Sequence, residues 1–450
     1  MKVHLIAIGG SAMHNLALAL HHKGFEVSGS DDAIFEPSKS RLDAFGLLPQ
    51  KIGWFPEKIH KDLDAIILGM HARIDNPELI KAQELKIPIY SYPEYIYNQS
   101  IDKKRVVIGG SHGKTSITAM ILHVLHHYNI DCDYMVGAKL DGFDTMVRLT
   151  AEAQVIVLEG DEYLSSPIDR RPKFHWYKPH IAILSGIAWD HINVFPTFEN
   201  YVNQFRIFKN DVEDVLFYCD DDKALSDLCQ EDSTCRLKSY CIPNHCVEDG
   251  ITYLTDGENK HRLEIFGEHN LQNLNAALLV CQELGIQKSD FYKAISIFKG
   301  ASKRLELVKR VESSVVYKDF AHSPSKLKAT SSAMKKQFKH RALVACMELH
   351  TFSSLNKDFL KEYMGAMDKP DIAIVYFSKE AIAHKKLEDI SVEQVHKAFG
   401  RQDLKVFTDS KEIQQFLKSL EWKNRNLLMM SSGNFDGIDF NCLAEDLLGS

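Results

Sequence analysis

No apolar run in this sequence is long enough to cross a membrane, since a spanning helix needs about 20 apolar residues. The strand-like run from Val3 to Ile8 is too short for a secretory signal and ends in glycine. Nine cysteines are scattered over 450 residues, which favours a reducing compartment over a disulfide-stabilised secreted protein. We therefore expect a cytoplasmic protein without a membrane segment.

The sequence also lacks an excess of basic residues. Its formal net charge of −7 argues against a broad nucleic-acid-binding surface. Cys241 and Cys246 flank His245, but no second ligand pair follows at zinc spacing. Internal repeats and low-complexity tracts are missing too. A hydrophobic content of 45% over this length indicates a globular protein of about three domains.

What the chain does contain is a strand, a glycine turn and a helix between Arg105 and Leu125. The β-branched run 105–109 predicts a buried strand, and residues 116–122 continue with helical periodicity. The turn is rich in groups that bind phosphate, because glycine backbone N–H groups and a helix N-terminus attract anions. The candidate nucleotide-binding residues are Gly110, Ser111, His112, Gly113, Lys114, Thr115 and Ser116.

Within this turn, Lys114 would reach the β- and γ-phosphates and the Thr115 hydroxyl would bind Mg²⁺. A general phosphate loop has a further glycine five residues before Gly113, where this chain has Ile108. The alternative is that Gly-Lys-Thr merely starts a helix, with Thr115 near its cap. The strand before the turn and the helix after it favour nucleotide binding.

Two further strand-like runs end in acidic residues. Glu159 follows the run 155–158, and Asp190 with His191 follows the run 181–184. Because ligands lie outside the carboxyl ends of strands in an open parallel sheet, these residues are candidate ligands of a Mg²⁺ that bridges ATP phosphates. Alternatively, the acids are solvated and His191 is an ordinary core histidine.

The first hundred residues follow a Rossmann-like order of strand, glycine turn, helix and strand. The turn holds Gly9, Gly10 and Ser11, and Asp31 follows the second strand, where it could hold a ribose hydroxyl. The full dinucleotide motif Gly-x-Gly-x-x-Gly is missing, so nicotinamide binding is only an alternative. Further along, His71 and Asn76 follow the next strand, 65–69, and complete the candidate substrate-binding residues of this domain.

The remaining chain predicts two more α/β regions. Residues 210–259 are polar and irregular, and no chemistry is assigned to them. Beyond residue 300, strands and helices alternate again. We expect an α/β protein of three domains: a Rossmann-like domain over 1–100, a central P-loop ATPase-type parallel-sheet domain over 101–300, and a C-terminal Rossmann-like domain over 301–450.

Taken together, these motifs resemble those of the Mur ligases, the ATP-dependent amide-forming enzymes of peptidoglycan synthesis. The resemblance implies that Glu159 and His191 bind Mg²⁺ and that Arg304 contacts a phosphate. It implies that Asp319 contacts the ATP ribose, within a motif that continues to His322 and Pro324. It further implies that UDP-N-acetylmuramate binds the first domain at Gly9, Gly10, Ser11 and Asp31. On the adenine side of ATP it places His269, Asn270 and Asn273.

Two branches of this family use UDP-N-acetylmuramate as the acid substrate. One adds L-alanine in biosynthesis, and the other adds the recycled tripeptide L-alanyl-γ-D-glutamyl-meso-diaminopimelate. Stretches around Phe35, Asp169 and Met430 resemble the tripeptide branch, which is our main expectation, with the alanine branch as the alternative. The stretch with His350 and Thr351 resembles the alanine enzyme in form, but that enzyme's two carboxylate-binding arginines are replaced by Thr351 and Ser354.

The resemblance implies that ATP converts the substrate carboxylate into an acyl phosphate, which an amine then attacks. Lys114, Glu159, His191, Arg304 and His322 are the candidate catalytic residues, with His350 a second candidate for the base. Other possibilities are a nicotinamide-dependent oxidoreductase and a nucleotide-driven binding protein without ligation. Small-molecule substrates, no nucleic acid and a monomer or dimer are expected.

Overall fold

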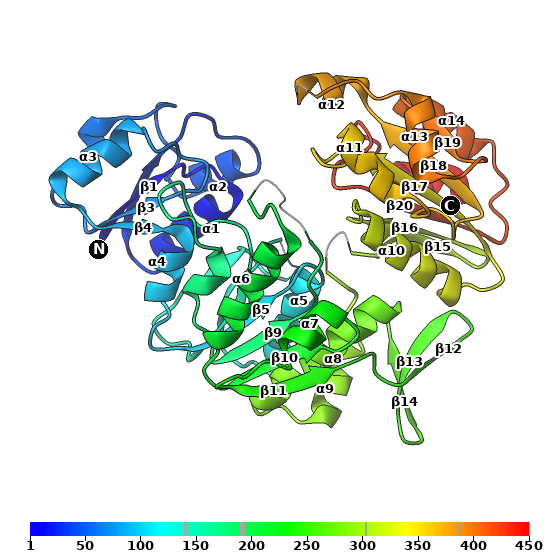
Figure 1. Cartoon of the computed structure of the whole chain (residues 1–450), viewed down its shortest axis with the longest axis horizontal. Coiled ribbons are helices and arrows are strands. Elements are labelled where there is room, and N and C mark those ends of the chain that lie inside the picture. Colours follow the sequence, from blue (N-terminus) through cyan, green and yellow to red (C-terminus); the bar gives the residue numbers. More distant parts are fainter. Residues whose placement is uncertain (139, 141, 190–193, 302–303, 386, 450) are drawn as a thin grey trace. The chain divides into compact units, whose positions relative to one another are not determined.

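The computed structural model describes residues 1–138, 140, 142–189, 194–301, 304–385 and 387–449. These residues form an α/β protein with four sheets (Figure 1). The chain divides into two compact units, a first of Met1–Ile242 with Gln272–Ile295 and a second of Pro243–Leu271 with Ser296–Ser450. None of the described helices is long and apolar enough to span a bilayer. The expected α/β class, with mainly parallel sheets, is confirmed.

The N-terminal sheet is parallel, with strand order β2-β1-β3-β4. Its strands are β1 (Lys2–Ile6), β2 (Glu26–Ser30), β3 (Ala65–Leu68) and β4 (Ile89–Ser91). Its helices are α1 (Ser11–His22), α2 (Ser38–Ala44), α3 (Pro77–Leu85) and α4 (Tyr92–Asn98). Strand β4 is short, because Lys86 ends α3 in the left-handed conformation and Ser91 caps α4 with a capping box.

The second sheet has the order β11-β10-β9-β5-β8-β6-β7 and is parallel except for the β6–β7 pair. Its strands are β5 (Lys104–Gly109), β6 (Asp133–Met135), β7 (Val147–Arg148), β8 (Val155–Glu159), β9 (Ile181–Leu184), β10 (Val215–Cys219) and β11 (Arg236–Tyr240). The central strand β5 lies between β9 and β8, so the carboxyl ends of these three strands are neighbours. Their continuous apolar runs are typical of strands buried on both faces.

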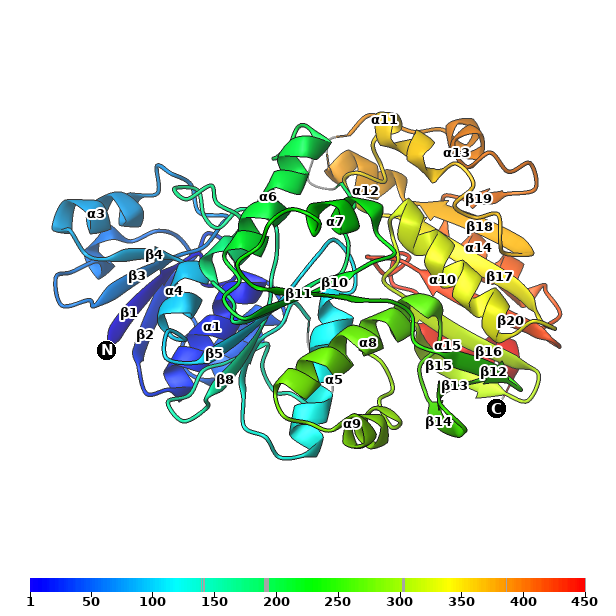
Figure 2. The same ribbon diagram turned by 60° about the horizontal axis from the view of Figure 1, so that its bottom comes forward.

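Further helices belong to the first unit, except that residues 268–271 at the start of α8 belong to the second. They are α5 (Lys114–His127), α6 (Phe198–Asn210), α7 (Lys223–Leu228), α8 (Glu268–Glu283) and α9 (Lys288–Ile295). Figure 2 shows α5 and α9 side by side. The Tyr128 hydroxyl, just after α5, donates to the Asp290 carbonyl at 2.9 Å, which fixes the end of α5 against α9.

The segment 210–259, expected to be irregular, is mostly ordered. It contains β10, α7, β11, β12 (His245–Glu248) and β13 (Ile251–Asp256), and it ends where β14 (Asn259–Leu263) begins; β12, β13 and β14 form an antiparallel sheet. Strand β11 carries exposed polar side chains because it lies at a sheet edge, which hides the usual apolar signal. Lys209, completely buried, donates to the carbonyls of Leu228, Glu231 and Asp232 at 3.1 Å and so fixes the turn after α7.

The C-terminal sheet has the order β15-β16-β20-β17-β18-β19. Its strands are β15 (Glu306–Val311), β16 (Ser314–Asp319), β17 (Ala342–Leu349), β18 (Ile372–Phe377), β19 (Lys405–Phe407) and β20 (Arg425–Met430). Its helices are α10 (Pro324–Gln337), α11 (Lys357–Leu360), α12 (Lys379–His384), α13 (Val392–Phe399), α14 (Ser410–Lys418) and α15 (Phe440–Leu448).

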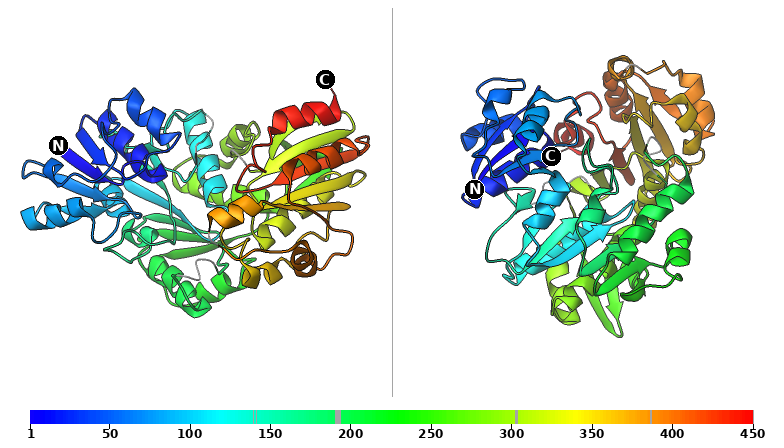
Figure 3. Two further views of the ribbon diagram at one scale, coloured as in Figure 1. Left: turned by 90° about the horizontal axis from the view of Figure 1, so that it is seen from above. Right: turned by 60° about the vertical axis from the view of Figure 1, so that its left-hand side comes forward.

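Only β15 runs antiparallel among the paired strands of this sheet that the structure describes. Separate apolar clusters bury its two faces. Helix α15, the red helix in Figure 3, packs against β15 and β16. Because β20 lies between β16 and β17, the loops after these three strands leave the sheet at adjacent positions.

Candidate active site

The predicted phosphate turn leaves the carboxyl end of β5, at the centre of the seven-stranded sheet. Gly110 and Gly113 have φ values of +120° and +77°, a region that favours glycine, and α5 begins at the next residue, Lys114. A Cβ on Gly113 would clash with the side-chain oxygen of Asn273, from α8. The structure thus places Asn273, predicted on the adenine side of ATP, directly against the turn.

The turn is also bonded to the segment that follows β9. The Ser111 hydroxyl donates to the Ala188 carbonyl at 3.0 Å and accepts from the Ala188 N–H at 2.8 Å, and Ser111 N–H donates to the Gly186 carbonyl. The Ser185 hydroxyl donates to the carbonyl of His112. These contacts hold the glycine turn in one conformation from the side of β9.

Lys114, at the start of α5, has a buried acidic partner. Its Nζ donates to Glu162 at 2.8 Å and to the Gly110 carbonyl at 2.7 Å. Glu162 also accepts from the Tyr201 hydroxyl at 3.1 Å. Burial lowers the pKa of Lys114, but the carboxylates of Glu162 and Asp161 outweigh it and leave the pKa above its usual value. Lys114 is therefore a fixed positive charge, and its partner Glu162 was not among the predicted site residues.

The two described candidates for the Mg²⁺ site lie next to each other. The Thr115 hydroxyl donates to Glu159 Oε1 at 2.9 Å, and Glu159 Oε2 accepts from the Gly137 N–H at 2.8 Å. A hydroxyl and a carboxylate oxygen suit Mg²⁺, which prefers oxygen ligands. Asp190 and His191 lie outside the described residues, and those residues hold no cluster of three His, Cys, Asp or Glu side chains arranged for a metal.

The segment after β8 folds back on itself and adds a second ion pair. Lys173 Nζ lies 2.5 Å from Asp161, and backbone bonds join Lys173 to Tyr163 and Phe174 to Asp161. Burial raises the pKa of Asp161, yet Lys173 and Lys114 outweigh it, so the pKa falls below its usual value. Asp161 is therefore ionised close to the phosphate turn.

In the N-terminal domain, the structure brings Asp31 against the glycine turn. Asp31 accepts from the Gly9 N–H at 2.7 Å, Gly10 precedes α1, and Ser11 is its first residue. Burial raises the pKa of Asp31, and the hydrogen bonds from the Gly9 and Ala33 backbone offset only part of this rise.

The two other predicted residues of this domain differ in their surroundings. Asn76 is buried and caps α3 by accepting from the N–H groups of Glu78 and Leu79. His71 is exposed in the turn after β3. Their roles in substrate binding stay predictions.

In the second unit, the predicted ribose and phosphate residues are neighbours. Asp319 ends β16 and accepts from the N–H groups of Leu305 and Ala321 at 2.6 and 2.7 Å. The Arg304 guanidinium lies 5.0 Å from the centre of the Phe320 ring, which also meets His322 edge-on. The buried Asn270 side-chain amide donates to the Phe266 carbonyl, and this hydrogen bond stabilises the start of α8. The His269 ring lies beside Gly267.

The loops after β17 and β20 also meet. Glu348, 1% exposed, accepts from the Ser431 hydroxyl and from Phe435 N–H at 2.9 Å, and its other oxygen lies 3.4 Å from His350 Nδ1. The Thr351 hydroxyl donates to the Ser354 hydroxyl at 2.9 Å, and Ser354 donates to the Thr351 carbonyl. Glu348 was not among the predicted site residues.

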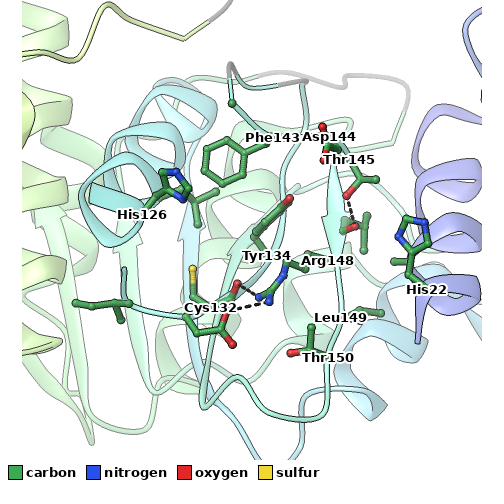
Figure 4. A pocket seen from close by; sticks show the side chains of 16 residues that line it. His22, His126, Cys132, Tyr134, Phe143, Asp144, Thr145, Arg148, Leu149 and Thr150 are labelled. Carbon is green, nitrogen blue, oxygen red and sulfur yellow. Dashed lines mark hydrogen bonds and ion pairs between the residues drawn. The ribbon is translucent and has the colours of Figure 1, made fainter. Parts of the chain in front are cut away.

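The first unit also contains a pocket of about 460 Å³ between α1, α5, β6 and β7 (Figure 4). Its wall includes His22, His126 and Arg148. The Arg148 guanidinium is held by the Cys132 carbonyl at 2.7 Å and by Asp131 at 2.8 Å. None of the described residues predicted to bind substrate or nucleotide lines this pocket.

Comparison with known proteins identifies the family. Residues 108–281 match the Mur ligase middle domain, and residues 2–101 match the Mur ligase family catalytic domain. A UDP-N-acetylmuramate–L-alanine ligase from Sulfurihydrogenibium sp. (strain YO3AOP1) is 30% identical, covering 96% of this chain and 95% of that protein. One from Clostridium kluyveri (strain ATCC 8527) is also 30% identical, over 83% of this chain and 82% of that protein.

Solved structures agree on the fold. A murein peptide ligase from Psychrobacter arcticus 273-4 has a TM-score of 0.65 at 21% identity, covering 100% of this chain and 99% of that one. The UDP-N-acetylmuramate–alanine ligase of Thermotoga maritima has a TM-score of 0.70 at 19% identity, covering 97% and 96%. The three-domain fold expected from the sequence is therefore confirmed. Because both family models match and a relative that is 30% identical covers 96% of its length, this chain belongs to the Mur ligase family and is an enzyme of the ligase class.

Proposed function

We propose that this enzyme uses ATP to join the lactyl carboxylate of UDP-N-acetylmuramate to an amine. The observation that carries the proposal is the edge of the seven-stranded sheet, where Lys114, Thr115 and Glu159 surround the glycine turn. A carboxylate and an amine do not condense in water, so the carboxylate is first phosphorylated to an acyl phosphate. Phosphoryl transfer depends mainly on positioning and charge neutralisation, which a fixed lysine supplies.

In this proposal, Thr115 and Glu159 would hold Mg²⁺, together with His191 from the predicted set. The bound ion supplies positive charge to the phosphate oxygens. The turn N–H groups orient the triphosphate and Lys114 neutralises its charge, while Asn273 contacts the turn from α8. UDP-N-acetylmuramate is assigned to Gly9, Gly10, Ser11 and Asp31, where the α1 N-terminus favours an anionic diphosphate.

The names of the curated relatives favour L-alanine as the acceptor over the tripeptide expected from the sequence. These relatives are UDP-N-acetylmuramate–L-alanine ligases, and the first of them aligns over nearly the entire chain. By this comparison, the enzyme would act in peptidoglycan biosynthesis.

The tripeptide is a second candidate that one contact favours. Thr351 and Ser354 stand where the resemblance expects two arginines for the alanine carboxylate, and their hydroxyls bond each other at 2.9 Å. Ser354 is completely buried. Without two charge-assisted bonds of roughly 1.5–3 kcal/mol each, a free amino acid has few groups left to hold. A tripeptide brings additional carboxylates, so recycling of peptidoglycan peptides is the function that this contact supports.

One assay tests both levels of the proposal. Purified enzyme receives ATP, Mg²⁺ and UDP-N-acetylmuramate with L-alanine, with the tripeptide, or with both in competition, and products are identified by mass spectrometry. Phosphate release that requires both UDP-N-acetylmuramate and an acceptor supports the ligase. Phosphate release that is independent of an acceptor points to a nucleotide-driven binding protein instead. The ratio of the two kcat/KM values decides the acceptor.

A further inference from the structure

A buried carboxylate and a partly exposed imidazole form a pair at the end of β17. Both oxygens of Glu348 are engaged: Oε2 accepts from Ser431 and Phe435, and Oε1 faces His350 Nδ1 at 3.4 Å. Glu348 is buried, whereas the His350 side chain is 38% exposed. A carboxylate beside Nδ1 favours the tautomer with a proton on Nδ1, which leaves Nε2 as the proton acceptor.

The loop after β20 is fitted closely to this pair. A Cβ on Gly433 would lie 2.7 Å from His350 Nδ1 and 2.8 Å from Glu348 Oε2. Real Cβ contacts are not this short, so a side chain at position 433 would have to displace the imidazole or the carboxylate. Glycine at this position therefore permits the pair to form.

The other histidine considered as a base, His322, has a backbone carbonyl among its neighbours. Its Nδ1 lies 2.9 Å from the carbonyl oxygen of Phe320, a neutral group. His350 Nδ1 instead faces an anionic carboxylate oxygen at 3.4 Å, and the negative charge of that oxygen attracts a proton on the imidazole more strongly than a neutral carbonyl does. Near Glu348, Tyr376 donates to Asp436, and burial together with Asp436 raises the pKa of Tyr376. Tyr376 is therefore neutral beside the pair.

We propose that Glu348 is a positioning residue that holds His350 as the proton acceptor for the acceptor amine. This inference rests on the proposed ligase function. In the step concerned, the amine nitrogen forms a bond to the carbonyl carbon of the acyl phosphate, and an amine proton passes to His350 Nε2. The bond from that carbon to the phosphate oxygen breaks, phosphate leaves with the electron pair, and the imidazolium returns its proton to solvent.

The test compares acceptors that differ in their need for a base. Variants His350→Gln and Glu348→Gln are assayed with L-alanine, with the tripeptide and with hydroxylamine, which is largely unprotonated at neutral pH. Hydroxylamine captures the acyl phosphate as a hydroxamate. His340→Gln is the matched control, since this exposed histidine precedes the opposite end of β17.

With the acceptor that the wild type uses, we expect kcat to fall by about 100-fold or more in His350→Gln, and in the same direction in Glu348→Gln. Hydroxamate formation from ATP and UDP-N-acetylmuramate should stay within about twofold of the wild type in each variant. Ligation at the wild-type rate in His350→Gln, or an equal loss of hydroxamate and amide, would overturn the inference. If wild-type enzyme makes neither product, the proposed function itself fails.

Gly433→Ala provides a second route should Glu348→Gln fold poorly. We expect it to lower amide formation and leave hydroxamate formation unchanged, because the three atoms nearest to its Cβ belong to the imidazole and the carboxylate. Normal amide formation in this variant would also contradict the inference.

Discussion

Lys114 Nζ lies 2.8 Å from Glu162 Oε2, so the lysine proposed to meet the phosphates already has a buried anionic partner. The Glu162 side chain is 3% exposed, whereas that of Lys114 is 16% exposed. The cation is therefore the accessible member of the pair. Triphosphate has to compete with Glu162 for Lys114, and Tyr201 stays with Glu162 through its own hydrogen bond.

We expect Lys114→Met to lower kcat by at least about 100-fold and to destabilise the protein. Catalysis suffers because the phosphoryl group loses its fixed positive charge. Stability falls by roughly 1–3 kcal/mol because a buried carboxylate is left with one donor fewer. Urea unfolding measures the second effect. Lys114→Met with Glu162→Gln should recover most of the stability and none of the activity, and exposed Lys339→Met serves as the control.

For the metal site, Thr115→Val and Glu159→Gln should each raise the Mg²⁺ concentration needed for half-maximal ligation. The structure places the Thr115 and Glu159 oxygens 2.9 Å apart; Thr115→Val removes one of these two proposed ligands, and Glu159→Gln removes the negative charge of the other. The measurement is a Mg²⁺ titration at saturating ATP. Thr118→Val, one turn further along α5, is the matched control because its hydroxyl bonds only the Lys114 carbonyl among the interactions described. Unchanged Mg²⁺ dependence in both test variants would remove them from the site.

Gly113→Ala should weaken ATP binding and lower stability through two separable effects. A φ of +77° costs a residue with a Cβ roughly 1–2 kcal/mol, and the new Cβ clashes with the Asn273 side chain. Adding Asn273→Ala relieves the clash but not the backbone strain. The double variant should therefore regain part of the stability in thermal unfolding. Full recovery would show that backbone conformation contributes nothing there.

The stability of the protein should fall as the pH drops below about 6.5, and His175 should contribute to that loss. Burial lowers the pKa of His175, partly offset by its hydrogen bond to the Gln204 carbonyl. Just below pH 6.5 the unfolded chain therefore binds more protons than the folded protein, so the free energy of unfolding decreases with falling pH.

Urea unfolding between about pH 5 and 7 tests this dependence. His175→Gln should reduce the slope of the unfolding free energy against pH by at most about 1.4 kcal/mol per pH unit, because the variant lacks one group that binds a proton on unfolding. Exposed His340→Gln should leave the slope unchanged. An unchanged slope in His175→Gln would contradict the expected pKa direction.

Strands buried on both faces were predictable because their signal is local. The runs that became β5, β8 and β9 are mainly apolar, and their predicted limits agree with the structure within a residue. Strand β11 was missed because Arg236 and Lys238 face solvent at a sheet edge, so its pairing with β10 decides its conformation. The start of α1 was placed too late, because Ser11 had been assigned to the turn.

The candidate site likewise contains residues that local motifs predicted and residues that only the structure revealed. Lys114, Thr115 and Glu159 stand beside local motifs, and parallel strand order predicts that they meet. The partners of these groups follow only from three-dimensional packing. Glu162 reaches Lys114 across 48 positions, and Glu348 reaches Ser431 across 83. Neither pair leaves a spacing pattern in the sequence.

The bonds from Ser111 and His112 to the segment 185–188 have a practical consequence for protein engineering. A phosphate turn transplanted from another ligase would arrive without its matching neighbours after β9. A Cβ on Gly110 would already lie 2.7 Å from the Ser185 nitrogen. Chimeras that exchange residues 110–113 alone should therefore misfit, whereas joint exchange with 185–188 preserves the interlocking surfaces. The two segments form a single transplantable module, although 72 positions separate Gly113 from Ser185 along the chain.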